Sequence, residues 1–247
     1  MEDKKSTVRA VDRALDVLLC FTQKPSLSLT DITMLTSLHK STVHRLLASL
    51  EEKGFVVRSA ETDKYTLGFR IWELSTHLPQ VDDPATILLP EMEKLGDLLG
   101  ETISLYIRDG NERVRIQAVQ SKQAIRRVAP IGARLPLYVG ASSKILVAYA
   151  DDEAQISLLS SINFPKSSDK EKYLIQLKQI RQDGYATSIE EREQGAAAVA
   201  VPIFDQSEKL AVVLSVSGPS NRLTLEKMQE HAPQMMEAAA RMGKMLR

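Results

Sequence analysis

Two segments near the start of the chain place apolar residues at helical spacing. The first begins at Ser28 or Thr30, two residue types that favour helix N-caps, and continues with apolar residues at positions 32, 35 and 38. The second spans residues 41–53, with a stripe at i, i+3, i+4 and i+7, and Gly54 ends it. Residues 37–40 form the turn between them. The stripe of the second helix is Val43, Leu46, Leu47 and Leu50.

The flanking residues extend this pattern. Residues 55–58 and 64–67 read as two strands around the polar segment 59–63, which predicts a β-hairpin. A further helix is expected over residues 8–21. Its expected core side is formed by Val11, Leu15, Leu18 and Leu19. This order is that of a winged helix-turn-helix, which places one helix in the major groove of DNA.

The polar face of the second helix combines cations with short hydroxyl side chains. No acidic residue occurs between positions 32 and 50, whereas a solvated helix face normally carries both signs of charge. Hydroxyl groups and helix N-termini bind phosphate oxygens, and an arginine such as Arg45 reaches a guanine edge. The residues expected to contact DNA are Arg9, Arg13, Lys40, Ser41, Thr42, His44, Arg45 and Lys64.

Two alternatives remain open for this region. The face over residues 40–49 also fits a winged helix that binds a protein, although its lack of acidic residues favours DNA. The hairpin also fits a solvated turn without a DNA contact, because Glu61 and Asp63 accompany Lys64.

The remainder of the chain alternates helical and strand patterns and predicts an α+β domain with a mainly antiparallel sheet. Asp109 and Gly110 form a strong hairpin signal between two of its strands. The expected helices span 69–78, 85–99, 142–149, 151–159, 170–183 and the segment from Thr224; the expected strands span 102–108, 113–119, 125–129, 197–204 and 210–217. The expected domains are a winged helix-turn-helix over 6–68, a linker helix and hinge over 69–84, and this α+β domain over 85–247.

Composition adds limits to this picture. The 247 residues carry no formal net charge, so attraction to DNA has to come from a local surface. Cys20 is the single cysteine, which excludes an internal disulfide and fits a reducing cytoplasm. No signal peptide or membrane-spanning segment is recognisable, so a cytoplasmic protein is expected.

The sequence favours no catalytic or metal chemistry. The four histidines are dispersed and accompany no cysteine cluster, so neither a zinc site nor another cofactor is expected. Residues 167–170 have Ser-x-x-Lys spacing without companion motifs, and no nucleophile elbow, P-loop or dinucleotide fingerprint occurs. An enzyme is therefore the disfavoured alternative.

The chain resembles the IclR family of bacterial transcriptional regulators over nearly its whole length. Part of the resemblance is the motif Lys40-Ser41-Thr42-Val43-His44-Arg45-Leu46-Leu47. The other matching segments are 14–18, 130–137, 140–144, 183–185, 198–205 with Gly195, and 214–219 with Arg222. The resemblance implies a GAF-like domain that binds a small organic effector. It also implies homodimers or dimers of dimers on palindromic DNA operators, with a repressor expected and an activator as the alternative.

The resemblance also maps an effector pocket onto this sequence. The implied positions are Ala141, Ser142, Ser188, Ala198, Ser215 and Ser217, with Ala124 and Arg127 as two further ones. The residues support part of this mapping independently, because Ser215 and Ser217 lie two apart in an apolar strand and point to one face. The segment 140–143, which includes Ser143, precedes a helix whose backbone N–H groups suit an anion; simple helix capping is the alternative.

Arg127 leads to a hypothesis about the effector. Better-known family members often have an apolar residue there, and an acidic one is found where this chain has Ser188. The loss of an acid and the gain of a cation favour an anionic effector, namely a small carboxylate or a sugar acid paired with Arg127. The alternative is that Arg127 turns outward with Arg126 and forms a surface ion pair.

Overall fold

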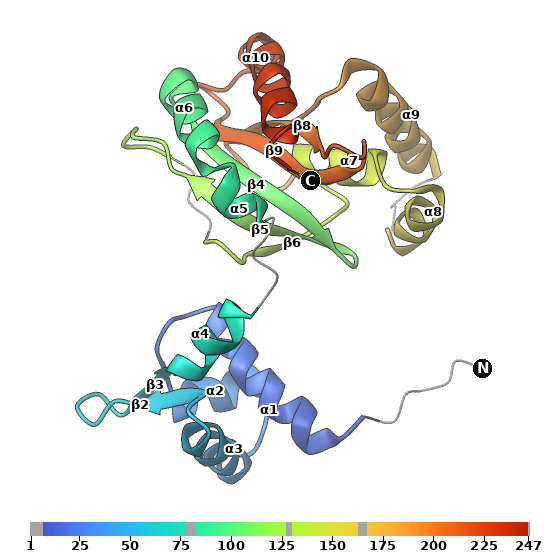
Figure 1. Cartoon of the computed structure of the whole chain (residues 1–247). Helices are drawn as coiled ribbons and strands as arrows, with labels where there is room; N and C mark the ends of the chain where they lie inside the picture. The colour runs from blue at the N-terminus through green and yellow to red at the C-terminus, as the bar shows by residue number, and fades with distance from the viewer. Residues whose placement is uncertain (1–6, 78–82, 127–129, 163–166, 247) are drawn as a thin grey trace. The chain divides into compact units, whose positions relative to one another are not determined.

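The chain forms two compact units, Met1–Val81 and Asp82–Arg247 (Figure 1). The structure, a computed structural model, describes residues 7–77, 83–126, 130–162 and 167–246. The architecture is a helix-turn-helix unit followed by an α+β unit built on an antiparallel sheet, as the sequence predicted.

The first unit packs helices around a short sheet with the strand order β1-β3-β2. Its core consists of Val17, Cys20, Phe21, Leu27, Ile32, Val43, Leu47, Val56 and Tyr65. Its elements are α1 (Arg9–Leu19), a 3₁₀ turn (Cys20–Thr22), β1 (Leu27–Ser28), α2 (Leu29–Thr36), α3 (Lys40–Glu52), β2 (Val56–Arg58), β3 (Lys64–Leu67) and α4 (Phe69–Thr76).

Local chemistry explains the boundaries of α2 and α3. Ser28 caps α2 in a reciprocal capping box: its hydroxyl accepts from the backbone N–H of Asp31, whose carboxylate accepts from the backbone N–H of Ser28 at 2.9 Å. Ser37 ends α2 in the left-handed region at φ 54°. Gly54 follows α3 at φ 74°, a conformation that favours glycine.

The predicted core side of α1 was wrong for three of its four residues. Val11, Leu15 and Leu19 are 54%, 52% and 61% exposed. The helix instead turns Val17 into the core, with Leu18 at its edge. Both sides of α1 are apolar enough to be buried, and packing against α2 and α3 selects one of them. The other apolar stripe remains on the surface of the unit.

The second unit consists of a six-stranded antiparallel sheet covered by helices on both faces (Figure 1). The strand order is β6-β5-β4-β9-β8-β7. The strands are β4 (Thr102–Asp109), β5 (Glu112–Val119), β6 (Arg134–Pro136), β7 (Ala186–Ile189), β8 (Ala196–Phe204) and β9 (Leu210–Pro219). The helices are α5 (Pro84–Ile87), α6 (Leu89–Leu99), α7 (Ala141–Ala148), α8 (Asp152–Ser161), α9 (Ser167–Asp183) and α10 (Leu225–Gly243).

Two hydrophobic clusters hold the helices to the sheet. The first joins α6 and α10 to one face and includes Met92, Leu214 and Met235. The second joins α7, α8 and α9 to the opposite face and includes Ile145 and Val213. Because Val213 and Leu214 are consecutive in β9, their opposite directions follow from the period-two geometry of a strand.

Several expected boundaries differ from the structure. The helix expected over 85–99 is divided at Leu88 into α5 and α6. Residues 125 and 126 of the expected strand 125–129 form no strand, and residues 127–129 lie outside the described residues. The short strands β1, β6 and β7 were not predicted, because two to four residues carry too little periodic signal. Pro233 lies inside α10, which Thr224 caps. Among the helices of the described residues, none has the length and apolar character needed to cross a bilayer.

The capping box gives a stability prediction. Ser28→Ala removes the hydroxyl that accepts from the Asp31 N–H, so we expect it to lower the free energy of unfolding of the first unit by about 1 kcal/mol. Urea unfolding followed by far-UV circular dichroism measures this loss. Thr30→Ala, on the exposed side of the same helix, is the control. Equal losses in the two variants would contradict the capping role.

The same contacts predict a pH dependence. Hydrogen bonds from Ser28 lower the pKa of Asp31 below its ordinary value. A carboxyl with a lowered pKa stabilises the fold above its unfolded-state pKa, and this contribution is lost as the pH falls through the lowered value. The difference between wild type and Ser28→Ala therefore shrinks in acid, in the same urea experiment. A difference that stays constant from neutral pH to the acid limit would exclude this coupling.

Candidate nucleic-acid interface and ligand cavity

The outer face of α3 brings together the residues expected to contact DNA. Lys40, Ser41, His44 and Arg45 are exposed, and Thr42 is half-buried. The opposite face of α3 buries Val43 and Leu47 in the core of the unit. Packing therefore leaves the cationic and hydroxyl side chains of α3 free for a partner.

The N-terminus of α3 has an unusual cap that the sequence reading missed. His39 is the N-cap residue, and its Nδ1 lies 2.8 Å from the Ser41 hydroxyl and 3.4 Å from the Ser41 backbone nitrogen, which donates to it. Serine, threonine, asparagine and aspartate are the usual N-caps, so the residue type gave no capping signal.

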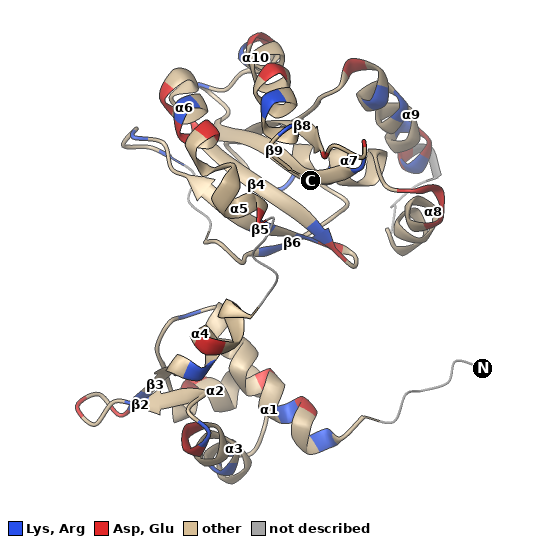
Figure 2. Ribbon diagram, in the orientation of Figure 1, with Lys and Arg blue, Asp and Glu red and all other residues tan. Residues whose placement is uncertain are grey.

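The other expected DNA contacts lie on neighbouring elements. Arg9 is exposed and Arg13 half-buried on α1, which packs against α3. Lys64 is exposed at the first position of β3. The turn before it is acidic (Figure 2), and Asp63 accepts a hydrogen bond from Arg58 at 2.7 Å. These acidic side chains favour the alternative of a solvated turn for the hairpin.

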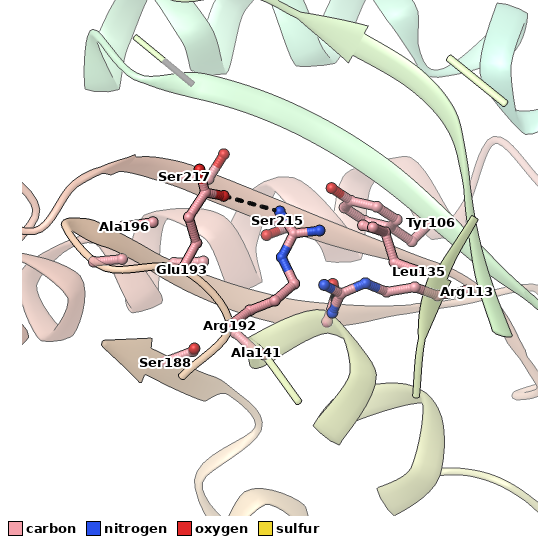
Figure 3. Close-up of a pocket in the computed structure, with 14 residues that line it drawn as sticks. Tyr106, Arg113, Leu135, Ala141, Ser188, Arg192, Glu193, Ala196, Ser215 and Ser217 are labelled. Carbon is pink, nitrogen blue, oxygen red and sulfur yellow. Dashed lines mark hydrogen bonds and ion pairs between the residues drawn. The ribbon is translucent and has the colours of Figure 1, made fainter. Parts of the chain in front are cut away.

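A cavity lies in the second unit between α7 and one face of the sheet (Figure 3). Its volume is about 50 Å³. A single water needs about 10–15 Å³ of such space, so a few waters or a small organic group fit. It is lined by Tyr106, Arg113, Leu135, Gly140, Ala141, Ser142, Ser188, Arg192, Glu193, Ala196, Ala197, Ala198, Ser215 and Ser217.

Strand register places the serines of the cavity side by side. Ser188 of β7 pairs with Ala198 of β8, and Ala198 pairs with Ser217 of β9. Directly paired residues of an antiparallel sheet point to the same face. Ser215, two residues from Ser217, points to that face as well. The small alanine leaves room above β8 between the hydroxyl groups.

Arg113 supplies a cation at the cavity wall. It lies on β5 with only 5% of its surface exposed. Its Nη1 donates to the hydroxyls of Ser142 and Ser143 at 2.9 and 2.7 Å and to the carbonyl of Val139 at 3.2 Å. Its guanidinium also lies 5.3 Å from the ring centroid of Tyr106. These contacts fix the guanidinium in an interior site, where a charge interacts strongly with an anion.

The N-terminus of α7 already has a carboxylate partner. The backbone N–H of Gly140 donates to Glu191 at 3.1 Å, and the buried Lys144 pairs with the other oxygen of the same carboxylate. Lys144 also donates to the carbonyl of Thr187 at 3.1 Å. The Glu191 carboxylate thus occupies the Gly140 N–H, which is one of the backbone donors of this segment.

Two charged residues of the loop between β7 and β8 reach the cavity. Arg192 and Glu193 line the cavity and form an ion pair with each other at 3.4 Å (Figure 3). The ion pair between Glu191 and Lys144 holds this loop to α7.

The expected effector residues differ in where the structure places them. Ala141, Ser142, Ser188, Ala198, Ser215 and Ser217 all line the cavity. Ser143 does not line it: this side chain is fully buried, and its hydroxyl donates to the carbonyl of Pro136 at 3.0 Å. Ala124 is exposed and is not part of the lining, and Arg127 lies outside the described residues.

Arg113, Tyr106, Arg192 and Glu193 were missed as cavity residues. The sequence did contain a signal for Arg113. Arg113 and Arg115 alternate with Val114 and Ile116, so both arginines lie on one face of the strand, and burial of that face requires polar partners for them.

A helix-turn-helix unit joined to an α+β unit with an internal cavity defines a class of bacterial transcription regulators. The model of the IclR helix-turn-helix domain matches residues 10–60, and that of the bacterial transcriptional regulator IclR C-terminal domain matches residues 81–243. The chain belongs to the IclR family. Like the relatives it matches, it is a DNA-binding transcription regulator and not an enzyme.

Named relatives agree with this assignment. HTH-type transcriptional regulator KipR of Bacillus subtilis is 32% identical over 99% of this chain and 98% of its own. HTH-type transcriptional repressor AllR of Escherichia coli is 30% identical over 87% of this chain and 82% of its own. An IclR homologue from Microbacterium hydrocarbonoxydans, crystallised with 4-hydroxybenzoate, has the same fold: its TM-score is 0.79 at 24% identity, over 95% of this chain and 98% of that one.

Gly140 gives a prediction about the cavity wall. It has φ 92°, and a Cβ atom there would lie 2.9 Å from Nη1 of Arg113. Gly140→Ala therefore adds a steric conflict to the strain of an alanine at φ 92° and ψ 154°, a backbone region essentially restricted to glycine. Gly132, also at positive φ (83°) but with no atom within 4 Å of such a Cβ, supplies the control. Thermal unfolding is expected to show a larger loss for Gly140→Ala; equal losses would exclude the conflict with Arg113.

Proposed function

We propose that this regulator is a ligand-responsive repressor that senses a small organic acid in the cavity beside α7. The observation that carries the proposal is the buried Arg113 guanidinium at the wall of a cavity with serine hydroxyls. Guanidinium and hydroxyl groups are hydrogen-bond donors that suit a carboxylate. Arg113 thus takes the role that the sequence reading assigned to Arg127.

The size and burial of the cavity support a small ligand. Its volume of about 50 Å³ suits a few non-hydrogen atoms. Ser188 and Ser215 are buried, and buried hydroxyls need hydrogen-bond partners that a bound acid supplies. The structural relative from Microbacterium hydrocarbonoxydans was crystallised with 4-hydroxybenzoate, which is a carboxylic acid.

The exposed apolar surfaces of the first unit support a homo-oligomer. Val8, the N-cap residue of α1, forms one outer stripe with Val11, Leu15 and Leu19 of the helix. On α4, Phe69 and Trp72 stack at 4.9 Å and are 66% and 59% exposed. Contiguous exposed apolar surface marks protein interfaces. A two-fold oligomer joined there would present two α3 helices to a palindromic operator, with half-sites about 34–36 Å apart or a multiple of that distance.

Ligand binding then acts by shifting the relative placement of two DNA-binding units. An acid that binds one arrangement better than another shifts the population toward that arrangement. Repression is favoured over activation because AllR is named as a repressor. The face of α3 favours DNA over a protein ligand, since its outer side chains are cationic or hydroxylic.

Substitution of Arg113 tests the acid site. Arg113→Met keeps an unbranched apolar stem but removes the guanidinium and its charge. We expect at least a tenfold loss of affinity for the acid that binds wild type, since bonds to charged groups contribute about 1.5–3 kcal/mol. Isothermal titration with acetate, pyruvate and 4-hydroxybenzoate gives the affinities. Arg134→Met on the neighbouring strand β6, with a half-exposed side chain, is the control. Undiminished binding by a folded Arg113→Met protein would remove Arg113 from the site, and no binding of any acid to wild type would argue against acid sensing.

Substitution of Arg45 tests the DNA surface. A base-edge contact contributes about 1–3 kcal/mol, so Arg45→Ala is expected to weaken binding to the intergenic DNA upstream of the gene by about tenfold or more. Fluorescence anisotropy across a salt series measures this loss. Lys53→Ala, an exposed cation at the other end of α3, is the control. Equal losses of affinity in the two variants would show that Arg45 contributes only general electrostatic attraction to DNA and no base contact.

A further inference from the structure

The N-cap of α3 has a side-chain geometry that selects one nitrogen of the His39 ring for contacts outside the protein. Nδ1 is held by Ser41, at 2.8 Å from its hydroxyl and 3.4 Å from its backbone nitrogen. Among the described residues, Nε2 has no hydrogen-bond partner, and His39 is exposed. The two nitrogens of the ring therefore have different environments.

The contact with Ser41 determines what Nε2 can do in either protonation state. In the neutral ring, Nδ1 accepts from the Ser41 N–H and hydroxyl, so the single ring proton resides on Nε2. In the imidazolium, Nδ1 donates to the Ser41 oxygen and Nε2 again carries a proton. In both states Nε2 is a hydrogen-bond donor directed away from Nδ1 and Ser41.

The surroundings of this donor suit an anion. Lys40 follows His39 directly, and the first turn of α3 contains no acidic residue. The aligned peptide dipoles of a helix give its N-terminus a partial positive charge. Thr42 and Val43 donate their backbone N–H groups to the His39 carbonyl, at 2.9 and 3.1 Å. These bonds fix the backbone of His39 to the start of the helix.

We propose that His39 donates from Nε2 to a phosphate oxygen of the DNA backbone, with Ser41 as the residue that positions the ring. The partner is DNA because α3 belongs to the helix-turn-helix of a DNA-binding regulator. A phosphate contact carries no sequence information and sets the position of α3 on the duplex. It differs in this from the contact proposed for Arg45, and it does not depend on the acid-sensing proposal.

The experiment separates the cap of α3 from the contact with DNA. His39→Ser keeps a strong N-cap but has no group that reaches beyond the helix end, whereas His39→Ala removes both functions. Affinities are measured by fluorescence anisotropy on the upstream intergenic fragment and on a 30-base-pair duplex of random sequence. Thermal unfolding is measured on the same full-length proteins.

We expect His39→Ala to lower both the melting temperature and the affinity, and His39→Ser to restore the melting temperature alone. The loss of affinity in His39→Ser is about tenfold and equal on both duplexes, because the lost bond is to a charged phosphate. Arg45→Ala, in contrast, loses more on the intergenic fragment. If wild type binds the intergenic fragment no better than the random duplex, the affinity of His39→Ser for the random duplex still tests the phosphate contact.

The positioning role of Ser41 has its own readout. Ser41→Ala weakens DNA binding more in the wild-type background than in His39→Ser, since the part of its effect that acts through the ring is already lost in His39→Ser. Equal losses in the two backgrounds would overturn the positioning role and leave only a direct contact of Ser41 with DNA. His77→Ser replaces another exposed histidine of the first unit, at the C-cap of α4, and is the matched control.

Three outcomes would overturn the phosphate contact. In the first, His39→Ser binds both duplexes within twofold of wild type, which leaves His39 as a cap only. In the second, its loss is confined to the intergenic fragment, which indicates a base contact. In the third, His77→Ser loses as much affinity as His39→Ser, which indicates a general effect of exposed imidazole groups.

Discussion

The hydrogen bonds of the interior Arg113 guanidinium are the interactions on which the cavity of the second unit depends. A charged group leaves water only if hydrogen bonds replace its hydration, and Arg113 obtains them from Ser142, Ser143 and the Val139 carbonyl. These partners join β5 to the start of α7. The close approach also explains why residue 140 is glycine, since a Cβ there would lie 2.9 Å from the guanidinium. The cavity is thus organised around a charge that the fold has already accommodated.

The first unit shows the opposite arrangement, with apolar groups left on its surface. None of the eight residues of α4 is buried, although its sequence includes Phe69, Trp72 and Leu74. Helices this short are marginal without packing partners. The outer stripe of α1 is likewise uncovered within the unit. Exposure of this kind on two helices supports the proposal that a second copy of the chain covers them.

Much of the fold was predictable because its long elements have strong periodic signals. The capping residue Ser28, the stripe of α3 and the paired strands β4 and β5 all occur where the sequence placed them. The errors have a common cause, which is that local patterns do not decide between competing partners. The sequence of α1 has two apolar sides, and only packing against α2 and α3 determined that Val17 is buried and Leu15 is exposed.

For the sites, the sequence by itself determined the polar face of α3 and the common face of Ser215 and Ser217, because one helix face and one strand period are local properties. The positions of Ser142 and Ser188 followed only from the family resemblance. Only the tertiary structure decided that Arg113, 27 or more positions before Gly140, Ser188 and Ser217, meets them at one cavity. It also decided that Glu191 accepts from the Gly140 N–H at the start of α7 and that His39 turns Nδ1 toward Ser41. Such contacts depend on register across β5, β4 and β9 and on rotamers fixed by neighbours, which no spacing along the chain specifies.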